Sequence, residues 1–349
     1  MNLNNIQQVL HQLENQLYPH CGKLQTFEIS SQNRFLFSEI TNVSLSYPQT
    51  TKKVVLKRPL TQNRKTNLDL SLIVEHEYQI LNYLYDRFSS HQKMNVIKPL
   101  AVLSEQSVLV TEHFPGDKLN ALILENLRFF HTRKKLTTMT NHTFLCGRWL
   151  KHFHDFTAKD EVVTLERASY IADLNNILRL DERYKLNKKV RERIFQFVHQ
   201  KFHRIDKQEL GLVGYHSDFT PWNILIKDDD LRVLDFDRFS HRCKYEDLTF
   251  FICCLDVIKS VVGIFARTID TLKRAFLEGY GKADINKNIL QIYILKNSIK
   301  CLNRIDTSKT ANVRYVDIKY ERFRKKRERK ILLSNLEQLL NDNYLLNLL

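Results

Sequence analysis

One stretch constrains the fold of this chain more than any other. It covers residues 216–226, HSDFTPWNILI, and is followed closely by residues 233–237, VLDFD. A polar loop leads into a short apolar strand, and the turn at residues 227–230 leads into a second apolar strand. This alternation predicts a hairpin. Its open end would gather an imidazole, an amide and two carboxylates, from His216, Asn223, Asp218 and Asp235.

Phosphoryl transfer from Mg-ATP requires groups of this kind. One carboxylate orients the attacking hydroxyl, while a second carboxylate and an amide oxygen hold Mg²⁺ against the phosphates. The pattern H-x-D-x-x-x-x-N, strand, turn, strand, D-F-x resembles the catalytic core of the protein-kinase-like fold. In detail it is most similar to the aminoglycoside phosphotransferase and choline kinase family. The sequence DFDR ending at Arg238 also resembles lipopolysaccharide-core sugar kinases. The resemblance covers roughly residues 57–255.

The resemblance implies an α+β fold with two lobes. Residues 1–112 would form a small nucleotide-binding lobe with an antiparallel sheet and one helix. Residues 113–349 would form a larger, mainly helical lobe for catalysis and substrate binding. Periodicity predicts an amphipathic helix at the N-terminus, with Ile6, Leu10, Leu13 and Leu17 on one face, and a second helix at residues 70–88. Short β-prone segments predict the sheet at residues 35–40, 43–47, 54–57, 96–103 and 107–111.

One carboxylate of the predicted helix lies on its apolar face. Glu77 shares that face with Leu81 and Leu84, and a carboxylate there needs a partner. Lys57 ends a predicted strand, and the resemblance implies that it binds the α- and β-phosphates of ATP and pairs with a glutamate. Glu75 is the competing choice, and a solvated carboxylate at the rim is the plain alternative.

The segment after residue 111 resembles the hinge of the family. Backbone groups of Glu112 and Phe114 would bind the adenine edge there, although Pro115-Gly116 is also an ordinary turn signal. The usual glycine-rich phosphate loop is missing. The chain has only 8 glycines, and Gly22 is the only one before this hinge. A turn at residues 30–33, with two serines, a glutamine and an asparagine, is the expected substitute.

The resemblance also implies the roles of the remaining site residues, with ATP and Mg²⁺ as cofactors. Asp218 would be the catalytic base or would orient the acceptor hydroxyl, and Asn223 and Asp235 would bind Mg²⁺. His216 would support the loop. Asp237, in place of a glycine, would contact a metal or cap Arg238. Asp247 would cap the following helix or brace the catalytic loop. Thr220 stands where protein kinases often carry a lysine, so charge stabilisation must come from elsewhere.

The net charge of the chain limits the classes of partner that it is expected to bind. The 349 residues carry a formal net charge of +15, which favours an anionic partner or reflects a solvated basic surface. No recognised motif supports specific binding of nucleic acid. The six cysteines lack zinc-ligand spacing and predict reduced thiols in a cytoplasmic protein. The polar N-terminus shows no apolar signal core.

The C-terminal region contains a basic run, residues 322–330, followed by leucines at helical spacing. Such a helix can make weak contact with an anionic membrane surface. We favour packing of the leucines on the chain's own core.

The predicted function is phosphoryl transfer to a hydroxyl of a small molecule, with a neutral or anionic sugar or glycan as acceptor. The Lys and Arg content of the second half argues against a polycationic acceptor. The competing view is an antibiotic (aminoglycoside) kinase with an acidic pocket lined by Glu246, Asp256 and Glu278. A non-catalytic kinase-like protein that binds a nucleotide or another anion is the third interpretation, against which the complete set of site residues argues.

Overall fold

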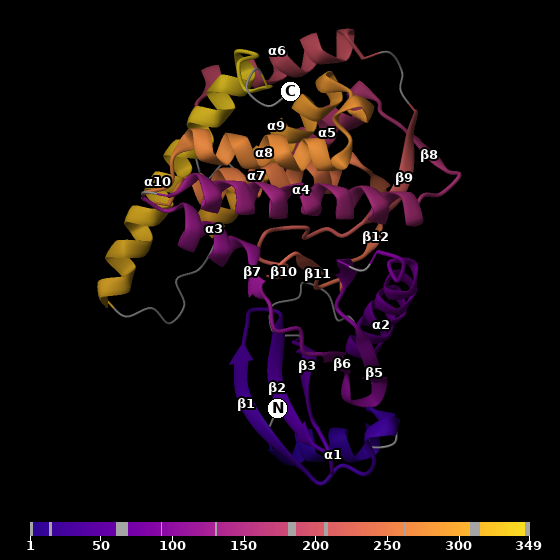
Figure 1. Cartoon of the computed structure of the whole chain (residues 1–349). Helices are drawn as coiled ribbons and strands as arrows, with labels where there is room; N and C mark the ends of the chain where they lie inside the picture. The colour runs from indigo at the N-terminus through magenta and orange to yellow at the C-terminus, as the bar shows by residue number, and fades with distance from the viewer. Residues whose placement is uncertain are drawn as a thin grey trace. The chain divides into compact units, whose positions relative to one another are not determined.

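The computed structural model describes residues 3–13, 16–60, 69–91, 93–129, 131–180, 186–205, 209–261, 263–307 and 315–345. The chain forms two compact units, each described separately below (Figure 1). Unit 1 comprises Met1–Gly116 and Leu225–Phe239, and unit 2 comprises Asp117–Ile224 and Ser240–Leu349. The α+β class predicted from the sequence is confirmed, with antiparallel strands in the N-terminal region and helices after it.

The main sheet of unit 1 is antiparallel and has the strand order β1-β2-β3-β6-β5. Its strands are β1 (Thr26–Arg34), β2 (Ser38–Ser46), β3 (Thr51–Pro59), β5 (Pro99–Leu103) and β6 (Val108–Glu112). Helix α1 (Leu3–Leu13) buries Ile6, Leu10 and Leu13 against apolar side chains of this sheet, such as Val43 and Leu45. The amphipathic N-terminal helix predicted from the periodicity is therefore present.

The predicted strand boundaries at the start of the sheet are wrong. Residues 35–40 and 43–47 were expected to be two strands, but β2 is one continuous strand from Ser38 to Ser46. The preceding turn lies at residues 35–37, so the proposed phosphate turn at residues 30–33 falls inside β1 instead. The alternating burial along β2 explains this, because one continuous strand places every second side chain in the core.

Helix α2 (Leu70–Arg87) agrees with the predicted helix at residues 70–88. It begins where the Asp69 side chain accepts a hydrogen bond from the Ser71 N–H at 2.9 Å. The strand predicted at residues 96–103 is in fact two. The structure separates β4 (Met94–Val96) from β5, because β4 pairs in parallel with β11 (Asp230–Val233). Residues Leu225–Phe239, which contain β11, also belong to unit 1. A single boundary between residues 112 and 113 would place this segment in the other lobe. The assignment of nucleotide binding to residues 1–112 and of catalysis to residues 113–349 stays a prediction.

Unit 2 is mainly helical, as expected. Its helices are α3 (Leu119–Leu127), α4 (Arg133–Phe156), α5 (Arg167–Leu180), α6 (Lys188–His203), α7 (Tyr245–Lys259), α8 (Ala266–Tyr280), α9 (Lys287–Thr307) and α10 (Tyr315–Leu340). Helices α4 and α8 approach closely at two glycines. A Cβ atom on Gly147 would lie 2.0 Å from the Phe276 carbonyl oxygen, and one on Gly279 would lie 2.0 Å from that of Phe144. Larger side chains at these two positions would force the helices apart.

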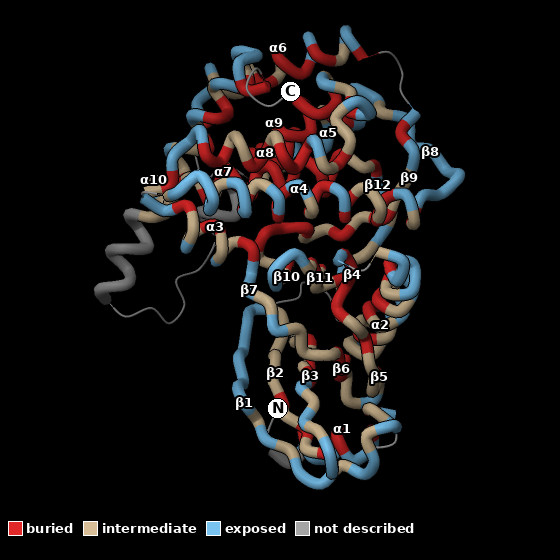
Figure 2. The backbone as a smooth tube through the Cα atoms, viewed as in Figure 1, coloured by how far each residue is buried: buried red, intermediate tan, exposed pale blue. Residues whose placement is uncertain are grey.

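Unit 2 also contains short strands, one of which leads into the loop that carries the sequence motif. They are β7 (Asp117–Lys118), β8 (Val162–Thr164), β9 (Glu209–Tyr215) and β12 (Ser240–Cys243). Strand β9 pairs with both β8 and β12 and ends directly before His216. Helix α7 starts after β12 and is buried along nearly its whole length (Figure 2). A buried helix next to the loop is a rigid support for it.

The leucine face of α10 packs on unit 2. Leu332, Leu336 and Leu339 are each 1% exposed, so these side chains are not available to insert into a membrane. This observation favours core packing over the membrane contact that we had left open. In the described part of the chain, no helix combines the length and the apolar character needed to cross a bilayer.

Candidate functional site

In unit 1 the predicted site residues meet around one lysine. Lys57 Nζ, on β3, lies 2.7 Å from Glu77 Oε1 and 2.5 Å from Asp235 Oδ1. The Glu77 side chain comes from α2 and is 2% exposed. Glu77 Oε1 also accepts the backbone N–H of Phe236 at 3.1 Å. The pairing of Lys57 with Glu77 is confirmed, and Glu75 does not take that place.

Electrostatics keep this lysine charged. Burial would lower the pKa of Lys57, but the carboxylates of Asp235 and Glu77 outweigh that effect and raise it above its ordinary value. Burial raises the pKa of Glu77 to about 7, although the Lys57 ammonium opposes the shift. Asp237 raises both values further. Unit 1 therefore holds a permanent cation between carboxylates.

The segment predicted to be the hinge begins at the end of β6. The N–H of Glu112 donates to the Lys98 carbonyl at 2.9 Å, and the N–H of His113 donates to the Lys53 carbonyl at 3.0 Å. The ring of Phe114 lies under the Arg232 guanidinium at 5.1 Å. These contacts tie the segment after β6 to other parts of unit 1. The N–H groups of Glu112 and His113 are already used inside unit 1.

In unit 2 the loop after β9 brings Asp218 and Asn223 together. The Asn223 amide nitrogen donates to Asp218 Oδ2 at 2.9 Å and to the Asp218 carbonyl at 3.0 Å. His216 is fully buried, and its Nδ1 accepts the N–H of Asp218 at 3.3 Å. The imidazole thus supports the loop, as the resemblance implied.

A buried carboxylate braces the same loop. Asp247 Oδ2 accepts the N–H of His216 at 2.6 Å, and Asp247 Oδ1 accepts the N–H of Ser217 at 3.1 Å. Of the two predicted roles for Asp247, the loop brace is observed. The helix cap is not, because Lys244 occupies the N-cap position of α7. Burial raises the pKa of Asp247 to about 8, even though the two backbone N–H groups lower it.

Two non-glycine residues at the site have left-handed backbone conformations. Ser217 has φ 70°, directly before Asp218, and Asp235 has φ 72°. Such conformations cost on the order of 1–3 kcal/mol each and persist where the surroundings enforce them. Asp247 accepts the N–H of Ser217 itself, and Glu77 accepts the N–H of Phe236, the residue after Asp235.

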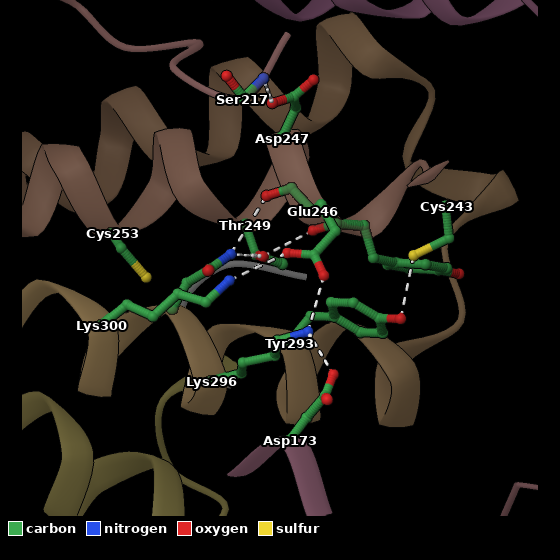
Figure 3. A network of polar contacts seen from close by, with 12 residues as sticks. Asp173, Ser217, Cys243, Glu246, Asp247, Thr249, Cys253, Tyr293, Lys296 and Lys300 are labelled. Carbon is green, nitrogen blue, oxygen red and sulfur yellow. Dashed lines mark hydrogen bonds and ion pairs between the residues drawn. The ribbon is translucent and has the colours of Figure 1, made fainter. Parts of the chain in front are cut away.

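A second ion-pair network lies beside the brace (Figure 3). Glu246 Oε1 lies 2.8 Å from Lys296 Nζ, and Glu246 Oε2 lies 3.4 Å from Lys300 Nζ, with both lysines on α9. Asn297 adds hydrogen bonds to the Glu246 carbonyl and to Thr249 Oγ1. Burial would raise the pKa of Glu246, but Lys296 and Lys300 outweigh it and lower the value. This network ties the first turn of α7, which carries Asp247, to α9.

Comparison with known proteins decides the family. A model of the phosphotransferase enzyme family matches residues 49–285. The chain belongs to this family. The predicted enzyme class, a phosphotransferase with an alcohol group as acceptor, is thereby confirmed. No curated protein sequence matches the chain significantly.

Solved structures share the kinase-like fold of this phosphotransferase. A spectinomycin phosphotransferase in complex with ADP and spectinomycin has a TM-score of 0.52 and 14% identity, over 95% of this chain and 98% of that chain. A choline kinase from Cryptosporidium parvum has a TM-score of 0.54 and 10% identity, over 97% of this chain and 98% of that chain. A glucosamine kinase in complex with glucosamine, ADP and inorganic phosphate has a TM-score of 0.52 and 13% identity, over 92% of this chain and 96% of that chain.

The phosphotransferase also contains a cavity that the sequence did not indicate. It has a volume of ≈ 910 Å³ and lies within unit 2, between the β8–β9 region and the start of α7. Its walls include Glu166, Glu209, Lys244 and Asp284, and no residue of the loop 216–223. The sequence analysis also missed Lys296 and Lys300, and it considered Glu246 only as a possible wall of an acidic pocket. Glu246 lies on α7 and both lysines lie on α9, and sequence spacing gives no sign that they meet.

The donor set suits a hard divalent cation. Asn223 and Asp235 carry amide and carboxylate oxygens, which are the ligands that Mg²⁺ prefers. Because the Asn223 amide nitrogen makes both hydrogen bonds to Asp218, its Oδ1 atom is the one left to act as a ligand. Among the described residues, no group of three or more histidine, cysteine, aspartate or glutamate side chains could hold a metal alone.

Proposed function

We propose that this phosphotransferase transfers the γ-phosphate of ATP, in the presence of Mg²⁺, to a hydroxyl of a sugar or glycan. The observation that supports the proposal is the partly buried Lys57 ammonium, which contacts both Glu77 and Asp235. The Asp218–Asn223 pair in unit 2 of the same chain supports it.

The residues of unit 1 would bind the nucleotide. Because the N–H groups of Glu112 and His113 are already used, an adenine edge would meet the carbonyl of Glu112 and the N–H of Phe114. Lys57 would bind phosphate oxygens, with Glu77 fixing its position. Asn223 and Asp235 would hold Mg²⁺, which neutralises phosphate charge when bound.

Asp218 would orient the acceptor hydroxyl and accept its proton. The Asn223 amide donates to one carboxylate oxygen of Asp218, and His216 Nδ1 accepts the Asp218 N–H, so both ends of the residue are held. In a loose transition state little proton transfer is needed early, and positioning supplies much of the effect.

The acceptor would be neutral or anionic. A polycationic acceptor needs carboxylates that are not already neutralised. Glu246 is paired with Lys296 and Lys300, and Asp256 is buried with Lys273, so neither serves an acidic pocket. The protein's net charge of +15 would also attract an anionic glycan. We expect the reaction to take place in the cytoplasm, where ATP is available.

The first test separates binding from chemistry. Asp218→Asn should lower kcat by about 10²–10⁴-fold, the usual range for a group of this kind. It should leave the Mg²⁺-dependent thermal shift by ATP unchanged. Asp229→Asn is the control, because Asp229 is 63% exposed and pairs only with a surface lysine. Full activity of Asp218→Asn would contradict the role, and a folded protein without any Mg²⁺-dependent shift would contradict ATP binding.

The acceptor class is tested with a panel of aminoglycosides, choline, free sugars, and acidic or phosphorylated glycans, scored by ATP consumption. We expect turnover of sugars or anionic glycans. The apparent affinity for an anionic acceptor should fall as salt rises, because charges are screened over about 10 Å at 0.1 M. Turnover of aminoglycosides alone would overturn the acceptor proposal and leave the kinase assignment unchanged.

A further inference from the structure

The turn between β1 and β2 contains no glycine and no polar side chain. Its residues 35–37 are Phe-Leu-Phe, and two of them are exposed, Phe35 at 53% and Leu36 at 62%. The turn is nevertheless held in place, because the Phe35 N–H donates to the Ser38 carbonyl and the Leu60 N–H donates to the Phe37 carbonyl, both at 2.8 Å. Apolar side chains offer no hydrogen bonds to phosphate oxygens.

The third residue of this turn holds an arginine instead. The guanidinium carbon of Arg238 lies 5.1 Å from the centre of the Phe37 ring. That distance is within the range of an attractive cation–π contact. Arg238 follows Asp237 and belongs to the segment that carries Asp235, so it lies in unit 1 together with Lys57.

The guanidinium keeps its hydrogen-bonding capacity. Its Nε atom lies 4.0 Å from Asp237 Oδ1, which is too long for a hydrogen bond, and the Arg238 side chain is 50% exposed. A ring against one face leaves the edge N–H donors of an arginine in place, and these match a phosphate group. Lys57, by contrast, already contacts two carboxylates.

We propose that Arg238 binds the nucleotide phosphates and that Phe37 positions it, so that the β1–β2 turn acts through an arginine where related enzymes use backbone N–H groups. The inference rests on the proposed use of ATP. It also accounts for the charge stabilisation that Thr220, standing in the place of a lysine, does not supply. Phe37 is a positioning residue that acts through the guanidinium.

The test compares ligands with and without phosphates. Dissociation constants of Mg-ATP, ADP and adenosine are measured by calorimetry for the wild type, Arg238→Met, Arg238→Lys and Phe37→Leu. Loss of a charge-assisted phosphate contact should weaken ATP about 10- to 100-fold in Arg238→Met and leave adenosine unchanged. Arg238→Lys should recover only part of the affinity, because an ammonium lacks the planar fork. Phe37→Leu should weaken ATP several-fold.

A second arginine–aromatic pair in unit 1 provides the control. Arg87 lies over Tyr83 at 5.3 Å on helix α2 of the same unit, so Arg87→Met removes a similar contact away from the site residues. It should leave all three affinities unchanged. Thermal midpoints confirm that each variant is folded.

The outcomes are distinguishable. If wild-type protein binds ATP and Arg238→Met binds it equally well, only this inference is overturned. If Arg238→Met weakens adenosine as much as ATP, the arginine supports the fold and does not bind phosphate, which also overturns it. If the folded wild-type protein binds no ATP, the proposed function fails and this inference fails with it.

Discussion

Unit 1 and unit 2 each contain one group of the predicted site residues, and the two groups hold a similar turn with different chemistry. Each contains a non-glycine residue in a left-handed conformation, Asp235 in unit 1 and Ser217 in unit 2. In each, a buried carboxylate accepts backbone N–H groups at that turn: Glu77 in unit 1 and Asp247 in unit 2. The difference lies in charge compensation. Glu77 has the Lys57 ammonium at 2.7 Å, whereas backbone N–H groups are the donors found at Asp247.

This difference shows how a carboxylate can be buried in two ways. With a cation beside it, burial raises the pKa of Glu77 to about 7. With backbone N–H donors, burial raises that of Asp247 to about 8. An ion pair would suit the phosphate binding that we propose for unit 1, because the lysine would serve both purposes. A carboxylate held only by N–H groups is suited to fixing a loop.

The largest effect is expected from removing the brace. Asp247→Ala leaves the N–H groups of His216 and Ser217 without their partner, at about 1–3 kcal/mol for each group, so the free energy of unfolding should fall by about 2–6 kcal/mol. Glu77→Ala removes the partner of one such group and leaves Lys57 with Asp235, so the loss should be smaller. Urea unfolding measures both. Asp173→Ala, at a 61% exposed carboxylate, is the control and should change little. Equal losses for Asp247→Ala and the control would contradict the brace.

The second prediction concerns pH. A carboxyl group with a raised pKa binds its proton more tightly in the folded than in the unfolded state. Its stabilising contribution is complete below about pH 4 and is lost as pH rises through the folded-state value. The free-energy difference between wild type and Asp247→Asn should therefore fall with rising pH until about pH 8. The slope should be at most about 1.4 kcal/mol per pH unit.

The same measurement on Glu77→Gln sharpens the comparison. Its difference from the wild type should fall in the same direction but over a smaller range of pH, since the Lys57 ammonium opposes the rise in the pKa of Glu77. Unfolding free energies from pH 4 to 9 test both curves. If the free-energy difference between the wild type and either variant rises with pH, the ionised carboxylate is the form that the folded state stabilises.

The smallest effect on stability is expected in the ion-pair network of Glu246 with Lys296 and Lys300. Lys296 is 9% exposed and lies 2.8 Å from Glu246, whereas Lys300 is 33% exposed and lies at 3.4 Å. Lys296→Met should lower the unfolding free energy by about 1–3 kcal/mol, because it removes the closer partner of a buried charge. Lys300→Met should cost under about 1 kcal/mol, as partly exposed pairs do. Hydrogen exchange at His216 and Ser217 should accelerate only in Lys296→Met. Equal effects of the two substitutions would mean that Glu246 does not depend on the closer lysine.

Much of the site could be predicted because its signals are local. The D-x-x-x-x-N spacing indicated that Asp218 and Asn223 lie close together. They are within hydrogen-bonding distance, because the loop between them is short. The apolar face of α2 identified Glu77 as a buried carboxylate that needs a partner, and Lys57 is that partner. Helical periodicity located α1 and α2, since a period of 3.6 residues is visible within a short window of the sequence.

What only the tertiary structure decided depends on contacts between distant segments. The turn between β1 and β2 was misplaced because strand register follows from pairing across the sheet, which the local pattern does not record. The return of Leu225–Phe239 to unit 1 depends on the pairing of β11 with β4. The contact of Arg238 with Phe37 and that of Lys296 with Glu246 join residues far apart in the chain. The amino-acid sequence by itself determined which chemical groups this protein carries and on which elements. Folding alone decided which charges meet, because a buried charge takes whichever partner the packing of distant elements brings within reach.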